Sequence, residues 1–375
     1  MLRFPLGWMA WDLTHSAFWV GVFSAVLLLP AIFLAPLFGV LSDRVNPRNG
    51  VLTTMFSQGA LAALITLMVW ADWLGLNGLL VVALVMGIVT SAHQPMRLAL
   101  LPKLVSRARL PSAIGLSAIV FNVSRVLGPA VAGVIIARAE PEWALAIAAC
   151  LFMGAWFALL RVHIEYQAVS ARETSVLTEL IDGLKFVAGH RAIGFVLALT
   201  LMNALLGRTV LELLPAISGK LLDGTAVQLA WLTAASGVGS VIGGILLTQQ
   251  RDRESTLMRL VLTCLTLAAL ILLPIYWLAT PWLLTLAVGL LSLVTTTVGI
   301  GGQALTQLTV AEQYRGRVMS LWSLLIMGGP AIGSFVVGAL ADILGFVSTL
   351  MGVSIAALLV LGFFWRQTSM YTPSR

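Results

Sequence analysis

Long apolar stretches separated by short polar ones recur along the whole chain. Eleven of them are long enough to cross about 30 Å of hydrocarbon as a helix. They are 18–40, 50–71, 79–101, 112–138, 142–164, 192–217, 225–247, 257–279, 281–310, 318–341 and 345–365. Because unpaired backbone groups are costly in hydrocarbon, and because no alternation typical of a barrel is visible, every stretch predicts a helix. The pattern therefore predicts an all-α polytopic membrane protein.

The first apolar stretch, Met1 to Leu13, is shorter than the others. As a helix it rises only about 20 Å, roughly two-thirds of the hydrophobic thickness, which leaves Arg3 near the membrane interior. We therefore expect eleven full spans plus a truncated first helix, with the native start upstream of Met1 or the chain shortened.

Composition narrows the class of protein. Of the 375 residues, 59% are hydrophobic and 10% are charged, against about 25% charged residues in a soluble domain. The net charge of +7 comes from basic residues paired in the loops, without a continuous patch, so we expect no nucleic-acid partner. The four histidines lack metal-ligand spacing and no Walker motif is present. We expect no metal, no cofactor and no ATP-driven pump on this chain.

The lysines and arginines predict the orientation. Alternate loops on one side carry nearly all the basic loop residues, whereas the other side carries Arg138 and Lys220. By the positive-inside rule the richer side, with the C-terminus, is cytoplasmic. We expect a multi-pass protein of the cytoplasmic (inner) membrane.

The longest polar interruption divides the chain near its middle. We predict an N-terminal six-helix bundle at 1–164, a linker at 165–191 and a C-terminal six-helix bundle at 192–375. Apolar residues from 176 to 187 follow helical spacing, which predicts an amphipathic helix along the cytoplasmic interface. An ordinary tether is favoured over a regulatory role for this helix.

An internal repeat supports two halves. The motif at 107–109 is followed by Gly-Pro-Ala at 128–130, and a similar motif at 315–317 is followed by Gly-Pro-Ala at 329–331. Repeats in parallel order indicate two six-helix halves related by a pseudo-two-fold axis along the membrane normal.

The polar segment from Gly39 to Arg48 lies between two apolar stretches and predicts a short loop at the membrane surface. Its residues Gly39, Leu41, Asp43 and Arg44 resemble the signature loop between helices 2 and 3 of the major facilitator superfamily. Arg48 stands one place later than the usual arginine.

Further motifs resemble one branch of this superfamily, which contains the enterobactin exporter and multidrug-type exporters. They lie at 100–105, 110–113, 125–129, 212–216 and 315–320. The resemblance implies twelve helices in two bundles that work by alternating access. It also implies a secondary active transporter, not an enzyme, that exports small amphipathic molecules such as a drug, siderophore or metabolite in exchange for protons. The alternatives are a truncated, non-transporting membrane scaffold and, less favoured, a membrane enzyme.

Ionisable residues inside the predicted spans are candidates for substrate or proton coupling. They include Asp12, Arg125, Arg208 and Glu212. Arg208 and Glu212 are four residues apart, so one helix face would carry both and they could pair. In the superfamily that the chain resembles, the outer ends of helices 1 and 7 meet when the cavity faces inward. A cluster of Asp12, Arg208 and Glu212 would then be an outer gate or proton site, or equally a static ion pair.

Arg125 lies one turn before Gly128-Pro129 and would be a counter-charge for an anionic substrate or a neighbouring carboxylate. Pro129 removes a backbone hydrogen bond, while Gly128 and Gly133 permit close helix packing. This segment resembles the Gly-Pro element of antiporters, which limits leak through the cavity.

The loop residues Gly39, Asp43, Arg44 and Arg48 predict a cytoplasmic gating latch. Asp43 would accept hydrogen bonds from a basic residue or a helix N-terminus, and the two arginines would hold anionic lipid or carboxylates across the bundle boundary. The alternative is a simple topology signal. The expected partners are a small-molecule substrate, protons and membrane lipids, and we expect a monomer.

Overall fold

The structure is a computed structural model that describes residues 2–106, 109–162, 185–222, 224–248, 254–275, 277, 280–310 and 312–368. The N-terminal helices are α1 (Arg3–Thr14), α2 (Ala17–Arg44), α3 (Pro47–Trp70), α4 (Leu76–Leu104), α5 (Leu110–Arg138) and α6 (Pro141–Leu160). The C-terminal helices are α8 (Arg191–Asn203), the π-helical turn η2 (Ala204–Arg208), α9 (Thr209–Glu212), α10 (Leu214–Leu221), α11 (Ala226–Thr248), α12 (Glu254–Leu272), α13 (Pro281–Thr309), α14 (Glu312–Leu344) and α15 (Phe346–Thr368). Residues 185–189 are also helical.

The helices confirm the all-α polytopic prediction. Each of the eleven predicted stretches coincides with a helix or with a consecutive group of helices. Among the described residues, nine helices are long and apolar enough to cross a membrane. The described parts of α5 and α12 contribute shorter apolar segments, Val126–Arg138 and Thr256–Leu272. The first helix, α1, has 12 residues.

The predicted loop from Gly39 to Arg48 is mostly helical, which corrects the sequence prediction. Helix α2 continues to Arg44, and only Val45 and Asn46 separate it from Pro47, the first residue of α3. Proline restricts the residue before it to extended conformations, so α3 starts sharply after Asn46. The Asn46 side chain caps α3 by accepting a hydrogen bond of 3.0 Å from the Arg48 backbone N–H.

The predicted span at 192–217 is interrupted, which is a second correction. After α8, a π-helical turn inserts an extra residue, and the Thr209 hydroxyl donates a hydrogen bond of 3.0 Å to the Ala204 carbonyl five residues earlier. Helix α9 then ends before Leu213, and Pro215 occupies the first turn of α10. Because proline lacks an N–H and clashes with the preceding turn, the α-helical ladder breaks here.

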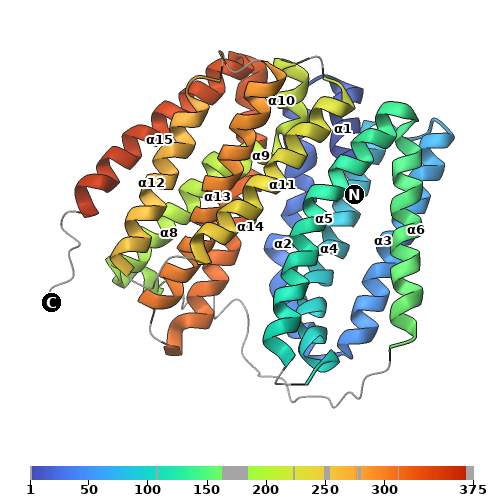
Figure 1. The fold of residues 1–375 in the computed structure, drawn as a ribbon, viewed down its shortest axis with the longest axis horizontal. Helices are drawn as coiled ribbons and strands as arrows, with labels where there is room; N and C mark the ends of the chain where they lie inside the picture. Colours follow the sequence, from blue (N-terminus) through green and yellow to red (C-terminus); the bar gives the residue numbers. More distant parts are fainter. Residues whose placement is uncertain are drawn as a thin grey trace.

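The helices form two side-by-side groups, α1–α6 and α8–α15, here called the N half and the C half (Figure 1). Helix α2 packs against α14, and α5 packs against α11, so these four helices form the seam between the halves. We call the end where α1 turns into α2 the His15 end, and the opposite end, where α2 turns into α3, the Asn46 end. The positive-inside rule predicts that the His15 end faces outward.

The chain enters the C half through residues 185–189, next to α8. The Phe186 ring stacks at 4.0 Å on both the His190 ring and the Tyr314 ring of α14. Most of the predicted linker helix, including residues 176–184, lies outside the described residues.

Candidate functional site

The seam between α2 and α14 is built from small residues. A Cβ added at Gly338 would lie 2.6 Å from the Ala17 carbonyl oxygen, and one added at Gly21 would clash with the Ser334 carbonyl. The Ser334 hydroxyl, which is fully buried, donates a hydrogen bond of 3.3 Å to the Gly21 carbonyl. Small residues let helix backbones approach closely, so the two halves touch main chain to main chain here.

In the other part of the seam, α5 packs against α11. A Cβ added at Gly133 would overlap the Ala230 side chain. The predicted packing residue Gly133 therefore lies at the contact between the halves. Gly128 and Pro129 lie about one turn earlier in α5, which continues through Pro129 as a helix.

An ion pair crosses between the halves beside this seam. The guanidinium of Arg3 in α1 donates a hydrogen bond of 2.8 Å to the carboxylate of Glu212 at the end of α9. The Glu212 side chain is 18% exposed and that of Arg3 is 49% exposed. The backbone carbonyl of Glu212 also accepts a hydrogen bond of 3.3 Å from the Ser24 hydroxyl of α2. Residue 212 of the C half is thus held by two residues of the N half.

The other two members of the predicted cluster take different places. Arg208 ends the π-helical turn and lies within electrostatic range of both Glu212 and Arg3. Because the residues after this turn, from Thr209 to Glu212, are α-helical, the four-residue spacing between Arg208 and Glu212 is kept. Asp12 is exposed, about 13 Å along α1 from Arg3. The described ion pair of Glu212 is with Arg3.

Sequence reasoning missed Arg3 as a partner of Glu212. The signal was present, because a basic residue in an apolar half-span is as costly as the acid itself and needs a counter-charge. The sequence does not show which of several charged residues in the membrane supplies this counter-charge.

Asp342 makes a second polar contact across the seam, at the His15 end. Its carboxylate accepts hydrogen bonds from the Ser16 hydroxyl, from the Ala17 N–H at 3.1 Å and from the Phe18 N–H at 3.2 Å. Asp342 belongs to α14, whereas the three donors start α2. The carboxylate thus neutralises the positive end of a helix dipole in the opposite half.

At the Asn46 end, the predicted latch residue Arg48 contacts α6 of its own half. Its guanidinium donates to the Leu160 carbonyl at 2.7 Å and to the Val162 carbonyl. These carbonyls end α6 and lack partners within the helix, so Arg48 ties the start of α3 to the end of α6. The side chains of the other predicted residues, Gly39, Asp43, Arg44 and Arg125, lie outside the described part of the chain.

A buried polar pair lies inside the C half, next to the π-helical turn. The Asn203 amide donates a hydrogen bond of 3.2 Å to the Thr295 carbonyl of α13. Both residues are 1% exposed. Within the described residues, the Asn203 amide oxygen and the Thr295 hydroxyl have no hydrogen-bond partner. Nearby, hydroxyls join α11 to α13 through Ser292, which bonds the Ser240 hydroxyl at 2.8 Å.

No group of three histidine, cysteine, aspartate or glutamate side chains capable of holding a metal ion occurs among the described residues. Among the described residues, the Arg3–Glu212 ion pair joins charged groups of the two halves.

Two helical halves that meet along a small-residue seam, with polar contacts crossing it, are the arrangement expected of a membrane transporter built from two repeats. The chain belongs to the transmembrane secretion effector family (MFS_3), which matches residues 3–371. It is a multi-pass membrane transporter and not an enzyme.

Two curated relatives are a transporter and an exporter by name. The chain is 23% identical to the staphyloferrin A transporter of Staphylococcus aureus over 364 residues, covering 96% of this chain and 90% of that protein. It is 25% identical to the enterobactin exporter EntS of Escherichia coli over 361 residues, covering 93% of this chain and 85% of that protein.

Solved structures share the fold at low sequence identity. The nucleoside transporter NupG superposes with a TM-score of 0.72 at 13% identity, covering the whole of this chain and 97% of that one. A bacterial homologue of the lysosomal transporter Spinster, in an inward-facing and unoccupied conformation, superposes with a TM-score of 0.63 at 12% identity and the same coverage. The predicted superfamily is confirmed.

Proposed function

We propose that the protein is a secondary active exporter that moves small amphipathic molecules out of the cell by alternating access, in exchange for protons. The Arg3–Glu212 ion pair is the observation that carries the proposal. It joins the two halves, so its formation and loss accompany any motion that separates them. Glu212 is the proton site, because a carboxylate can be neutralised at ordinary pH and a guanidinium cannot.

The coupling step follows from this geometry. With Glu212 ionised, the pair holds α1 against α9 and keeps the His15 end closed. When Glu212 takes up a proton, Arg3 loses its counter-charge and the halves separate at that end. Arg208 lies at the end of the π-helical turn, within electrostatic range of both groups, so its positive charge is part of the same cluster.

The class of substrate is proposed from the relatives. Two of them are named for staphyloferrin A and enterobactin. Both are siderophores, small polar ligands with apolar or aromatic parts. Arg125, in α5 of the seam, is placed in the interior of its span, where a cation would attract an anionic substrate. Gly128, Pro129 and Gly133 of the same helix limit leak by keeping α5 against α11.

The segment with Gly39, Asp43 and Arg44 is the cytoplasmic gate in this proposal. These residues form the last turns of α2, the helix that carries the seam. The hydrogen bonds from the Arg48 guanidinium to main-chain carbonyls hold α3 and α6 together behind that gate. Asp43→Asn keeps the side-chain shape and removes the charge. We expect normal membrane insertion with lost transport, whereas a topology signal alone would leave transport unchanged.

The remaining parts of the proposal concern organisation. The halves correspond to residues 1–164 and 192–375, joined by a linker at 165–191, and the C-terminus is cytoplasmic. The protein acts as a monomer, with anionic lipid at the basic loops of its cytoplasmic side.

Transport in everted membrane vesicles tests the function. In such vesicles an exporter drives uptake, so we expect uptake of radiolabelled enterobactin or of ethidium when a proton gradient is imposed. An ionophore that collapses the gradient should abolish this uptake. Uptake equal to that of vesicles without the protein would overturn export, and uptake insensitive to the ionophore would overturn proton coupling.

A further inference from the structure

Asp342 is placed unfavourably for its own helix. It lies in the last turn of α14, where a carboxylate faces the negative end of the helix dipole. Its hydrogen bonds go instead to Ser16, Ala17 and Phe18, which start α2. The first N–H groups of a helix have no partner within it, so the carboxylate satisfies them. This contact exists only while the two halves meet at the His15 end.

Lys220 makes a second contact between the halves at the same end. It lies in the last turn of α10, and its ammonium group sits 5.6 Å from the centre of the Trp11 ring in α1. This distance is within the range of a cation–π interaction. The neighbouring Gly219 leaves room for the Trp11 ring, which a Cβ there would overlap. Separation of the halves removes Trp11 from Lys220.

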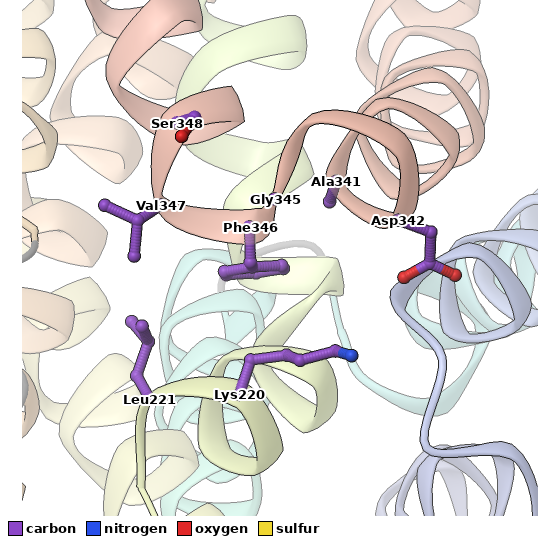
Figure 2. Close-up of a pocket in the computed structure, with 8 residues that line it drawn as sticks. All are labelled: Lys220, Leu221, Ala341, Asp342, Gly345, Phe346, Val347 and Ser348. Atoms are coloured by element: carbon purple, nitrogen blue, oxygen red, sulfur yellow. The ribbon is translucent and has the colours of Figure 1, made fainter.

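The two charged residues line one pocket of the C half. The pocket has a volume of about 430 Å³ and lies between α10 and the junction of α14 with α15. Figure 2 shows the Lys220 side chain extended toward the side of the pocket where Asp342 lies. Both residues are exposed. Since α10 and α14 belong to the same half, the pocket keeps both residues when the N half moves away.

We propose that Asp342 and Lys220 are a partner-exchange latch: each holds the N half in the closed state, and they pair with each other when the His15 end opens. The proposal rests on the proposed function, because it requires a state in which the halves have separated at this end. When the His15 end opens, the Asp342 carboxylate and the Lys220 ammonium group lose their partners in the N half at the same time. Their pairing across the pocket compensates in part for their separation from α2 and Trp11.

A double-mutant cycle on the opening reaction tests the exchange. Ser334→Cys, a nearly isosteric change at a fully buried seam position, reports opening through its rate of maleimide labelling. The full chain carries Cys150→Ser to remove the exposed native thiol, and protein without Ser334→Cys gives the background from the buried Cys264. The Asp342→Asn change is compared in the presence of Lys220 and in the Lys220→Gln background.

We expect Asp342→Asn to accelerate labelling in both backgrounds, because it removes the negative charge that stabilises the start of α2. The acceleration should be about threefold larger in Lys220→Gln, an effect of the size that an exposed ion pair produces. With Lys220 present, Asp342→Asn also removes the open-state pair, which partly cancels its effect. An equal or smaller acceleration in Lys220→Gln overturns the exchange.

Matched controls stay at the same end of the molecule. Asp72→Asn and Arg138→Gln remove exposed charges at the His15 end of the N half, and they should leave labelling unchanged. If Asp342→Asn fails to insert, Asp342→Ser replaces it, since a hydroxyl still accepts a hydrogen bond without the charge. Labelling needs no substrate or gradient. Coupling in the cycle without proton-driven uptake would overturn the proposed function alone, and uptake without coupling would overturn the latch alone.

Discussion

Arg3 and Glu212 are 209 residues apart in sequence and form an ion pair of 2.8 Å between the N half and the C half. The pair lies where α1 meets the end of the interrupted span α8–α9. Because both helices have partners mainly in their own halves, the pair connects two bodies that alternating access moves against each other.

Glu212→Gln should abolish proton-driven uptake while leaving the amount of protein in the membrane unchanged. Glutamine keeps the shape and removes the charge, and its amide oxygen still accepts a hydrogen bond from Arg3, so the protein should still insert. Vesicle uptake with an imposed proton gradient measures the first effect and quantitative immunoblotting the second. Asp72→Asn is the control. Uptake at the parent level would remove Glu212 from the coupling step.

Gly338→Ala should lower the thermal unfolding midpoint, because the added methyl group lies 2.6 Å from the Ala17 carbonyl. Overpacking of this kind costs about 1–3 kcal/mol. Gly352→Ala is the matched control, since nothing lies within 4 Å of its added methyl group and alanine favours a helix by about 0.5–1 kcal/mol over glycine. Tryptophan fluorescence on heating compares the two. A midpoint for Gly338→Ala at or above that of Gly352→Ala would contradict the close seam.

Arg48→Gln should destabilise the protein by about 1.5–3 kcal/mol, the size of a hydrogen bond to a charged group. The reason is that the Leu160 and Val162 carbonyls at the end of α6 lose their donor. Chemical denaturation in detergent micelles measures the change. Arg161→Gln, an exposed arginine beside these carbonyls, should have little effect. Equal effects of the two changes would show that net charge, not the contact, matters.

Ser292→Ala should destabilise the C half by about 0.6–1.7 kcal/mol, the range measured for hydrogen bonds between membrane helices. The Ser292 hydroxyl bonds the Ser236 carbonyl at 2.6 Å and the Ser240 hydroxyl at 2.8 Å, so it links α13 to α11. Thr285→Ala is the control, because the Thr285 hydroxyl bonds only within its own helix, to the Pro281 carbonyl. A smaller loss in Ser292→Ala than in Thr285→Ala would contradict the role of the hydroxyl.

The span pattern could be predicted because hydrocarbon thickness sets the length of every helix. The bounds of α3, α4 and α13 therefore fall within a few residues of the predicted stretches. The loop predicted before α3 was wrong because polar residues such as Ser42 and Asp43 continue α2 to Arg44, and α3 begins at Pro47 after the Asn46 cap. Hydropathy does not indicate where α2 ends, whereas the Asn46-Pro47 step does.

The contacts between the halves could be predicted only in part. Glu212 was a candidate because an acid in a span is costly wherever it sits. Its partner Arg3 and the cap by Asp342 depend on which helices meet, and the donors of that cap are 324 to 326 residues away in the chain. The π-helical turn before Thr209 was also invisible, since its sequence is as apolar and helix-compatible as its neighbours.

The polar contacts made by Asp342 and Arg48 are directed mainly at main-chain groups of the opposing helix. Every amino acid except proline supplies the same N–H, and every amino acid supplies the same carbonyl. The backbone partner in each of these hydrogen bonds is therefore independent of the side chain at its position. As far as these hydrogen bonds are concerned, relatives can vary in side-chain chemistry at Leu160 and Val162, and at Phe18 in any residue but proline, while Asp342, Arg48 and the Ser16 hydroxyl must be kept.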